Sequence, residues 1–82
     1  GIRVNAVAPA LTRTPLSRSL WENETALKAS VAMHPLGRIG APADIAAAVL
    51  YFLSDEAGWT TGQVLGVDGG LSAGVPQARV TA

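Results

Sequence analysis

Residues 1–16 read GIRVNAVAPALTRTPL, and this stretch decides the fold. Side chains alternate between two sides over residues 2–8, which is the pattern of a β-strand with at least one buried face. Pro9 has no N–H to give to a sheet ladder, so we expect strand pairing to stop there. Residues 10–14 then form a loop at the carboxyl end of the strand, where open α/β sheets bind their ligands.

The composition bounds the size of the domain and its class of partner. A chain of 82 residues suffices for one small domain, yet 49% of the residues are hydrophobic and 15% are charged, which is an apolar composition for so short a chain. This excess predicts apolar surface that another segment or subunit covers. Six Lys and Arg residues balance six Asp and Glu residues without forming a stripe, which argues against a nucleic-acid partner.

Metal and membrane functions find no support in the sequence. Without cysteine and with a single histidine, the chain offers no disulfide, no thiolate site and no His-based metal centre. The longest apolar run, residues 45–53, has nine residues against the roughly 20 that a membrane-spanning helix requires. We see no secretory leader pattern at the start. We therefore expect a soluble, cytoplasmic protein with no membrane partner and no metal.

The middle of the chain is predicted to be helical. Residues 15–33 fit two short helices joined near Asn23, whose side chain can cap the second helix. His34 precedes Pro35 and is biased toward an extended backbone, so the second helix ends by residue 33. A third helix over residues 42–54 begins with proline, and it is apolar around most of its circumference. Helices of that kind are buried on more than one side.

Glycines and a second strand complete the pattern. Gly37 and Gly40 lie in the turn LGRIGAP and are expected to supply unusual backbone angles. Residues 63–67 form a second strand, and residues 73–82 form a tail. The order strand, helices, strand is typical of a crossover unit in a parallel sheet. Because two strands are too few for a sheet that stands alone, the sequence predicts an α/β fold that is the last part of a doubly wound parallel sheet.

The polar residues that follow the first strand are the strongest site candidates. Thr12 and Thr14 offer backbone amides and hydroxyls to a planar amide or a phosphate without any charge. The alternative is that both threonines satisfy turn backbone or cap the next helix, and their spacing leaves both interpretations open. Structural roles are simpler for the others: loop packing for His34, a helix-start charge for Asp44 and aromatic packing for Trp59.

Several linked motifs resemble the C-terminal part of a short-chain dehydrogenase/reductase. They are N-A-V-A-P with a following threonine, G-R-x-G-x-P-x-D, F-L-S-D and T-G-Q-x-L-x-V-D-G-G, and the likeness runs from residue 2 to about residue 72. Members of this family have a Rossmann-type sheet and move a hydride between NAD or NADP and a small alcohol or carbonyl compound. The resemblance implies that residues 1–72 are the C-terminal part of one such domain, with its last two strands and the helices between them.

The same resemblance assigns roles to single residues. Pro9 and the loop after it would lie against the nicotinamide. Thr12 would contact the carboxamide through its backbone, and Thr14 would do so through its hydroxyl. Residues 15–33 would form the lid over the substrate.

The resemblance also implies a partner. In such enzymes the helix over 42–54 and the strand over 63–67 commonly pack against a second subunit, so we expect a homo-oligomer, a dimer or a tetramer. This agrees with the apolar character of that helix.

Two departures from the family pattern bear on activity. Ala10 stands where the family usually has glycine after the proline. The glycine-rich phosphate loop and the catalytic serine with Tyr-x-x-x-Lys have no counterpart, because Tyr51 has no lysine four residues later. We assign no catalytic residue here and expect a fragment of an oxidoreductase that is inactive alone. The alternative is a dehydrogenase-like interaction module without catalysis.

Overall fold

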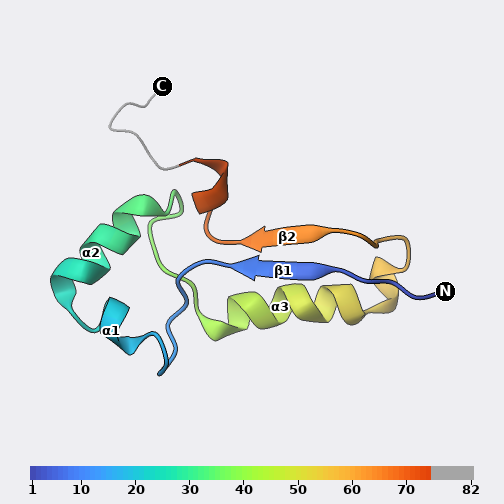
Figure 1. The fold of residues 1–82 in the computed structure, drawn as a ribbon, viewed down its shortest axis with the longest axis horizontal. Coiled ribbons are helices and arrows are strands. Elements are labelled where there is room, and N and C mark those ends of the chain that lie inside the picture. The colour runs from blue at the N-terminus through green and yellow to red at the C-terminus, as the bar shows by residue number, and fades with distance from the viewer. Residues whose placement is uncertain (75–82) are drawn as a thin grey trace.

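The computed structural model describes residues 1–74 (Figure 1). Its two strands, β1 (Ala6–Pro9) and β2 (Val64–Val67), pair in parallel. Between them lie α1 (Arg18–Trp21), α2 (Glu24–Met33) and α3 (Pro42–Leu53), and short 3-10 turns cover Asp55–Ala57 and Leu71–Ala73. The parallel pairing and the helical crossover confirm the predicted α/β class.

The helices occupy two different places relative to the strands. In Figure 1, α3 runs alongside β1, while α1 and α2 lie beyond the carboxyl ends of both strands. The chain leaves β1 at that end, passes through the two short helices and returns to the start of α3. The loop that follows β1 therefore lies between two helical parts of the chain.

The first strand begins later than the alternation predicts. Pairing starts at Ala6, opposite Val64, instead of at residue 2. The side chain of Asn5 replaces the ladder at this point, because its Nδ2 donates to the Thr60 carbonyl at 3.1 Å and its Oδ1 accepts the Gln63 N–H at 3.0 Å. A side-chain amide thus satisfies backbone groups that a longer strand would have paired.

The first strand ends at Pro9, where the sequence predicts the end of pairing. Pro9 is the last residue of the ladder, opposite Val67, so the expectation that strand pairing stops at this proline is confirmed. Ala6 donates its N–H to the Gln63 carbonyl at 2.8 Å, and Ala10 donates to the Val67 carbonyl at 3.4 Å. Because alternate residues of a strand face the same neighbour, the nitrogen of Pro9 points to the edge away from β2. A missing N–H there costs no bond to β2.

Local signals set the ends of α2 as predicted. The Asn23 side chain accepts the N–H of Ala26 at 3.0 Å, which caps the helix start. The helix ends at Met33, and His34 has the extended backbone expected before Pro35.

The third helix forms where its sequence predicts, but it is not covered. It begins at Pro42, and Asp44 in its first turn accepts the N–H of Ala41 at 2.7 Å. No residue of α3 is buried within the described chain, and Leu50 and Leu53 are 64% and 74% exposed. The expected burial on more than one side is therefore not supplied by residues 1–74.

Little apolar core exists within residues 1–74. Ile39 and Ala57 are the buried apolar residues of this part of the chain. Trp59 is almost fully exposed, so the expectation that it packs was wrong for the described residues. None of the helices there has the length and apolar character needed to cross a membrane. Most of the predicted tail, residues 75–82, lies outside the described part.

Candidate functional site

The structure brings the three predicted site residues together. Pro9, Thr12 and Thr14 line one open, largely apolar groove of about 580 Å³. The rest of its lining comes from α3 through Pro42, Ile45, Ala46, Val49 and Leu50. The groove therefore joins the carboxyl end of β1 to the apolar surface of α3.

The backbone of Thr12 is held by a second segment. Thr12 and Gly40 form an isolated parallel bridge, in which Gly40 donates its N–H to the Leu11 carbonyl at 2.9 Å and Arg13 donates to the Gly40 carbonyl at 2.8 Å. The N–H of Thr12 itself points away from Gly40 in this geometry. No acceptor for it is found among residues 1–74. A backbone donor is thus left available just past the end of β1.

The two threonine hydroxyls serve the local turn. Thr12 Oγ1 donates to the Ala10 carbonyl at 3.0 Å. Thr14 Oγ1 accepts the Ser17 N–H at 3.2 Å and lies 3.1 Å from Ser17 Oγ, where either oxygen can donate. The structural alternative left open by their spacing is therefore present in the fold. It leaves the Thr12 N–H for a ligand and, with Thr14 Oγ1 as the donor to Ser17 Oγ, one acceptor lone pair on Thr14 Oγ1.

Ser17 is a residue that the sequence interpretation missed. Its Oγ donates to the Thr12 carbonyl and accepts the N–H of Thr14 at 3.1 Å and the Nε1–H of Trp21 at 3.1 Å. The guanidinium of Arg13 also lies 4.6 Å from the centre of the Trp21 ring. A serine just before a short helix is a start signal, and that signal could have pointed to Ser17. The loop after β1 and α1 therefore form one hydrogen-bonded unit.

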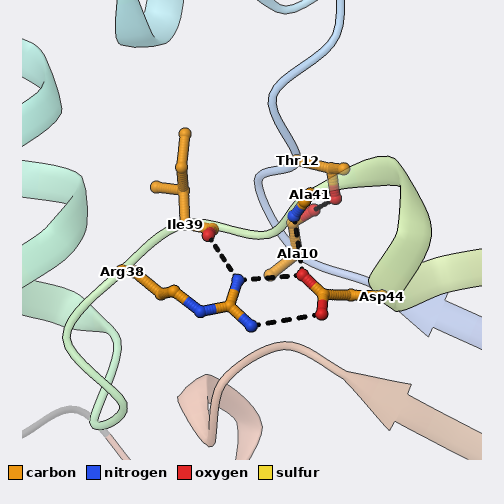
Figure 2. Close-up of polar contacts among 6 residues, drawn as sticks. All are labelled: Ala10, Thr12, Arg38, Ile39, Ala41 and Asp44. Carbon is orange, nitrogen blue, oxygen red and sulfur yellow. Dashed lines mark hydrogen bonds and ion pairs between the residues drawn. The ribbon is translucent and has the colours of Figure 1, made fainter.

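An ion pair braces the turn opposite this loop (Figure 2). Arg38 Nη1 donates to Asp44 Oδ2 at 2.8 Å, and Nη2 donates to Oδ1 at 3.1 Å. The Arg38 bond and the N–H of Ala41 lower the pKa of the Asp44 carboxyl from 3.8 to about 2, and the same pair raises the pKa of Arg38. Asp44 does mark the helix start as predicted, but its pairing with Arg38 was not foreseen.

Gly40 suits its position for a reason other than the expected one. Gly37 does adopt a left-handed backbone, with φ of 77°, whereas Gly40 does not. A Cβ on Gly40 would lie 3.2 Å from Thr12 Oγ1 and 3.5 Å from the Leu11 carbonyl oxygen. Gly40 thus permits close approach of two segments, and the prediction of an unusual angle was wrong there.

The remaining candidate, His34, takes the loop-packing role. It is buried, and its Nδ1 lies 2.6 Å from the Ser30 carbonyl oxygen. It lines a second cavity of about 320 Å³, which it shares with Arg38 and Asp68. Within residues 1–74 no three His, Asp or Glu side chains gather in a way that could hold a metal ion.

Comparison with known proteins gives a consistent result. A family model described as enoyl-(acyl carrier protein) reductase matches residues 1–72. The 3-oxoacyl-[acyl-carrier-protein] reductase of Thermotoga maritima is 47% identical over 70 residues, which are 85% of this chain and 28% of that protein. The chain thus spans less than a third of the length of this curated relative.

Solved structures agree with the sequence comparison. A gluconate 5-dehydrogenase from Burkholderia cenocepacia, in complex with NADP and tartrate, superposes with a TM-score of 0.84 at 32% identity, covering 92% of this chain and 29% of that one. A 4-hydroxyisoleucine dehydrogenase mutant complexed with NADH and succinate gives a TM-score of 0.85 at 33% identity, covering 92% and 31%. With the motifs, the parallel crossover and the match over residues 1–72 all in agreement, the chain belongs to the short-chain dehydrogenase/reductase family.

Proposed function

We propose that this chain is part of an NAD(P)-dependent oxidoreductase that moves a hydride between a nicotinamide cofactor and a small alcohol or carbonyl substrate. In this proposal residues 1–72 are the last two strands and intervening helices of a Rossmann-type domain. They act only together with the rest of a longer polypeptide, called the intact protein below. The proposal draws support from the share of the relatives that the chain covers and from the cofactors in two of the solved structures.

The observation that carries this proposal is the unpaired N–H of Thr12. It is a neutral donor at the carboxyl end of a parallel strand, where α/β sheets bind ligands. A carboxamide is planar and uncharged, with one strong acceptor oxygen and an NH₂ donor. A backbone N–H and a hydroxyl within two residues match both of these groups.

The three site residues divide the contact among them. The Thr12 N–H would donate to the carboxamide oxygen. The Thr14 hydroxyl would accept from the carboxamide NH₂. It would at the same time donate its own proton to Ser17 Oγ. Pro9 would place an apolar ring beside the nicotinamide at the mouth of the groove. NAD or NADP, when bound, supplies the hydride chemistry.

Other segments take the roles that the family resemblance implies. Residues 15–33, which include α1 and α2, form the substrate lid, and they join the site through Ser17. Residues 42–54 and 63–67 form a homo-oligomer interface in a dimer or a tetramer. The exposure of Leu50, Leu53 and Val64 supports this role, because large apolar side chains in such numbers mark contact surfaces. The intact protein is cytoplasmic in this proposal.

Titration of the intact protein with NADH and NADPH tests the cofactor contact. Replacing Thr14 by Val should weaken binding of the preferred cofactor about fivefold, the effect of one lost hydrogen bond. Thr61→Val is the matched control, because the Thr61 hydroxyl also accepts a backbone N–H, that of Val4 at 3.0 Å, but at the other end of β1. Equal cofactor affinity in the wild type and in Thr14→Val would refute the role of Thr14.

A second candidate function is an interaction module that does no chemistry. The exposed apolar side chains on α3 and β2, together with the almost fully exposed Trp59, favour it. An intact protein that binds neither cofactor, oxidises no NAD(P)H with any carbonyl tested and still assembles with a constant mass would support the module and overturn the enzyme. Cofactor binding with substrate-dependent NAD(P)H oxidation would instead support the enzyme and overturn the module.

A further inference from the structure

The segment opposite the candidate loop is a turn closed by side-chain hydrogen bonds. Arg38 spans it with both ends of its guanidinium on Asp44, and Nη1 also donates to the Ile39 carbonyl at 3.0 Å. Asp44 Oδ2 in turn accepts the N–H of Ala41. Figure 2 shows these bonds meeting around one guanidinium and one carboxylate. Two side chains thereby fix the backbone on both sides of Gly40.

Gly40 connects this turn to the candidate loop through backbone hydrogen bonds. It accepts from Arg13 and donates to Leu11, so the backbone of Thr12 lies in a fixed plane beside it. Thr12 has no other backbone pairing to a neighbouring strand among residues 1–74. Gly40 therefore holds the peptide groups on both sides of Thr12, alongside the bond from Ser17 Oγ to the Thr12 carbonyl. The turn that Arg38 and Asp44 close holds Gly40 itself.

We propose that Arg38 and Asp44 are positioning residues for the cofactor-contact loop, acting through Gly40 on the backbone of Thr12. This inference rests on the proposed function for its ligand, the nicotinamide carboxamide. Neither side chain needs to touch the cofactor. Their effect reaches it because a hydrogen bond weakens steeply when its donor turns away from the acceptor.

The exposure of the ion pair supports positioning over stability as its role. The Arg38 and Asp44 side chains are 58% and 34% exposed, and exposed pairs add little to the free energy of folding. The bidentate geometry adds directional precision, because the planar guanidinium fork matches only one orientation of a carboxylate. Lysine keeps the charge of arginine but lacks this fork, so it should not restore the orientation of the turn.

Two measurements on the intact protein test this inference. The first is amide hydrogen exchange at Arg13, whose N–H is bonded to Gly40, measured without cofactor. The second is the dissociation constant for NADH or NADPH. Arg38→Ala and Asp44→Asn should each speed exchange at Arg13 about tenfold and weaken the preferred cofactor about fivefold, with little change in the thermal midpoint. Arg38→Lys should behave like Arg38→Ala in both readouts.

Arg3→Gln is the matched control. Arg3 also uses its guanidinium to hold backbone carbonyls, but at the opposite end of α3. This variant should lower the thermal midpoint and leave both Arg13 exchange and cofactor affinity unchanged. A merely structural role for Arg38 would give the same pattern as Arg3, so the pair of variants separates the two roles.

The outcomes distinguish this inference from the proposed function. Unchanged Arg13 exchange in Arg38→Ala would overturn the positioning role, and so would faster exchange with unchanged cofactor affinity. Full rescue by Arg38→Lys would reduce the role to charge alone and also overturn it. A wild-type protein that binds neither cofactor would refute the proposed function, and exchange at Arg13 alone would then decide whether Arg38 and Asp44 position the loop.

Discussion

The two ends of α3 are both tied to the chain around β1, but by different kinds of contact. At the amino end, the turn closed by Arg38 and Asp44 pairs backbone to backbone with the loop that follows β1. At the carboxyl end, the side chain of Arg3 donates to the Phe52 carbonyl at 2.9 Å and to the Ser54 carbonyl at 3.5 Å. One end thus uses its side chains to shape a loop, and the other uses a side chain to hold a helix end.

The contacts at the two ends of α3 suit those ends to different roles. The last carbonyls of a helix lack partners within the helix, and a cation beside them also interacts favourably with the helix dipole. Around Arg3 the polar groups satisfy one another, with the Asn5 side chain paired twice to the turn before β2. At the opposite end the bridge leaves the Thr12 N–H unpaired among residues 1–74. A region that leaves a donor in a fixed direction is suited to bind something else.

The largest effect is expected from Ile39, the buried side chain of the amino-end turn. Ile39→Ala should lower the free energy of unfolding of the intact protein by about 3 kcal/mol, because it removes buried methyl groups and leaves a cavity. Urea unfolding measures this change. Leu36→Ala removes a similar side chain from the same turn, but one that is 74% exposed here, and should cost far less. Equal losses in the two variants would contradict the assignment of Ile39 as the anchor of this turn.

A smaller effect is expected at the carboxyl end. Arg3→Gln should lower the free energy of unfolding by about 1 kcal/mol, because glutamine cannot reach all the carbonyls that the guanidinium bridges. Arg18→Gln serves as the control, since the Arg18 side chain makes no hydrogen bond within residues 1–74. Thermal unfolding of the two variants measures the difference. A midpoint for Arg3→Gln equal to that of Arg18→Gln would show that this end is held by its backbone alone.

The smallest effect is expected when low pH protonates Asp44 and lowers the free energy of unfolding. The pKa of Asp44 is about 2 in the fold against its ordinary 3.8, so the folded state binds a proton less readily than the unfolded chain does. The stability that Asp44 contributes is therefore complete above about pH 4 and is lost as the pH falls toward 2. Unfolding measured from pH 5 to pH 2 should show a shallower decline for Asp44→Asn.

Asp68 provides the control for the acid experiment. Ser72 and the Gly70 N–H lower the pKa of Asp68 as well, so Asp44→Asn should keep part of the acid slope. Asp68→Asn, added to Asp44→Asn, should remove the part of the slope that remains. Added salt should shrink the Asp44 contribution, because its ion pair is exposed to solvent. An Asp44→Asn profile identical to that of the wild type would show that the ion pair does not persist in solution.

Sequence reasoning succeeded where a structure depends on neighbours in the chain. The cap at Asn23, the end of α2 before Pro35 and the start of α3 at Pro42 all follow from side chains within a few residues. The parallel crossover followed from the order of the elements, which needs no knowledge of contacts.

Sequence reasoning failed where the outcome depends on a distant segment. The start of β1 is set by Asn5 meeting residues near β2, and no periodicity reports that meeting. The end of β1 at Pro9 was predicted, but the edge that its nitrogen faces depends on register, which the sequence does not report. Gly40 is explained by the closeness of Thr12, which lies 28 positions earlier in the chain. Thr12 and Thr14 were candidates from their place after the first strand, and Pro9 came from the resemblance. Their shared groove became visible only in the fold.

Pro9 also limits what can be built beside β1. A strand joining the edge away from β2 would meet N–H donors at Asn5 and Val7 and none at Pro9. Its final ladder bond would be missing, and the two chains would diverge there. That divergence would fall at the mouth of the groove, ahead of Thr12. Pro9 would therefore end the pairing of any strand on that edge beside the groove.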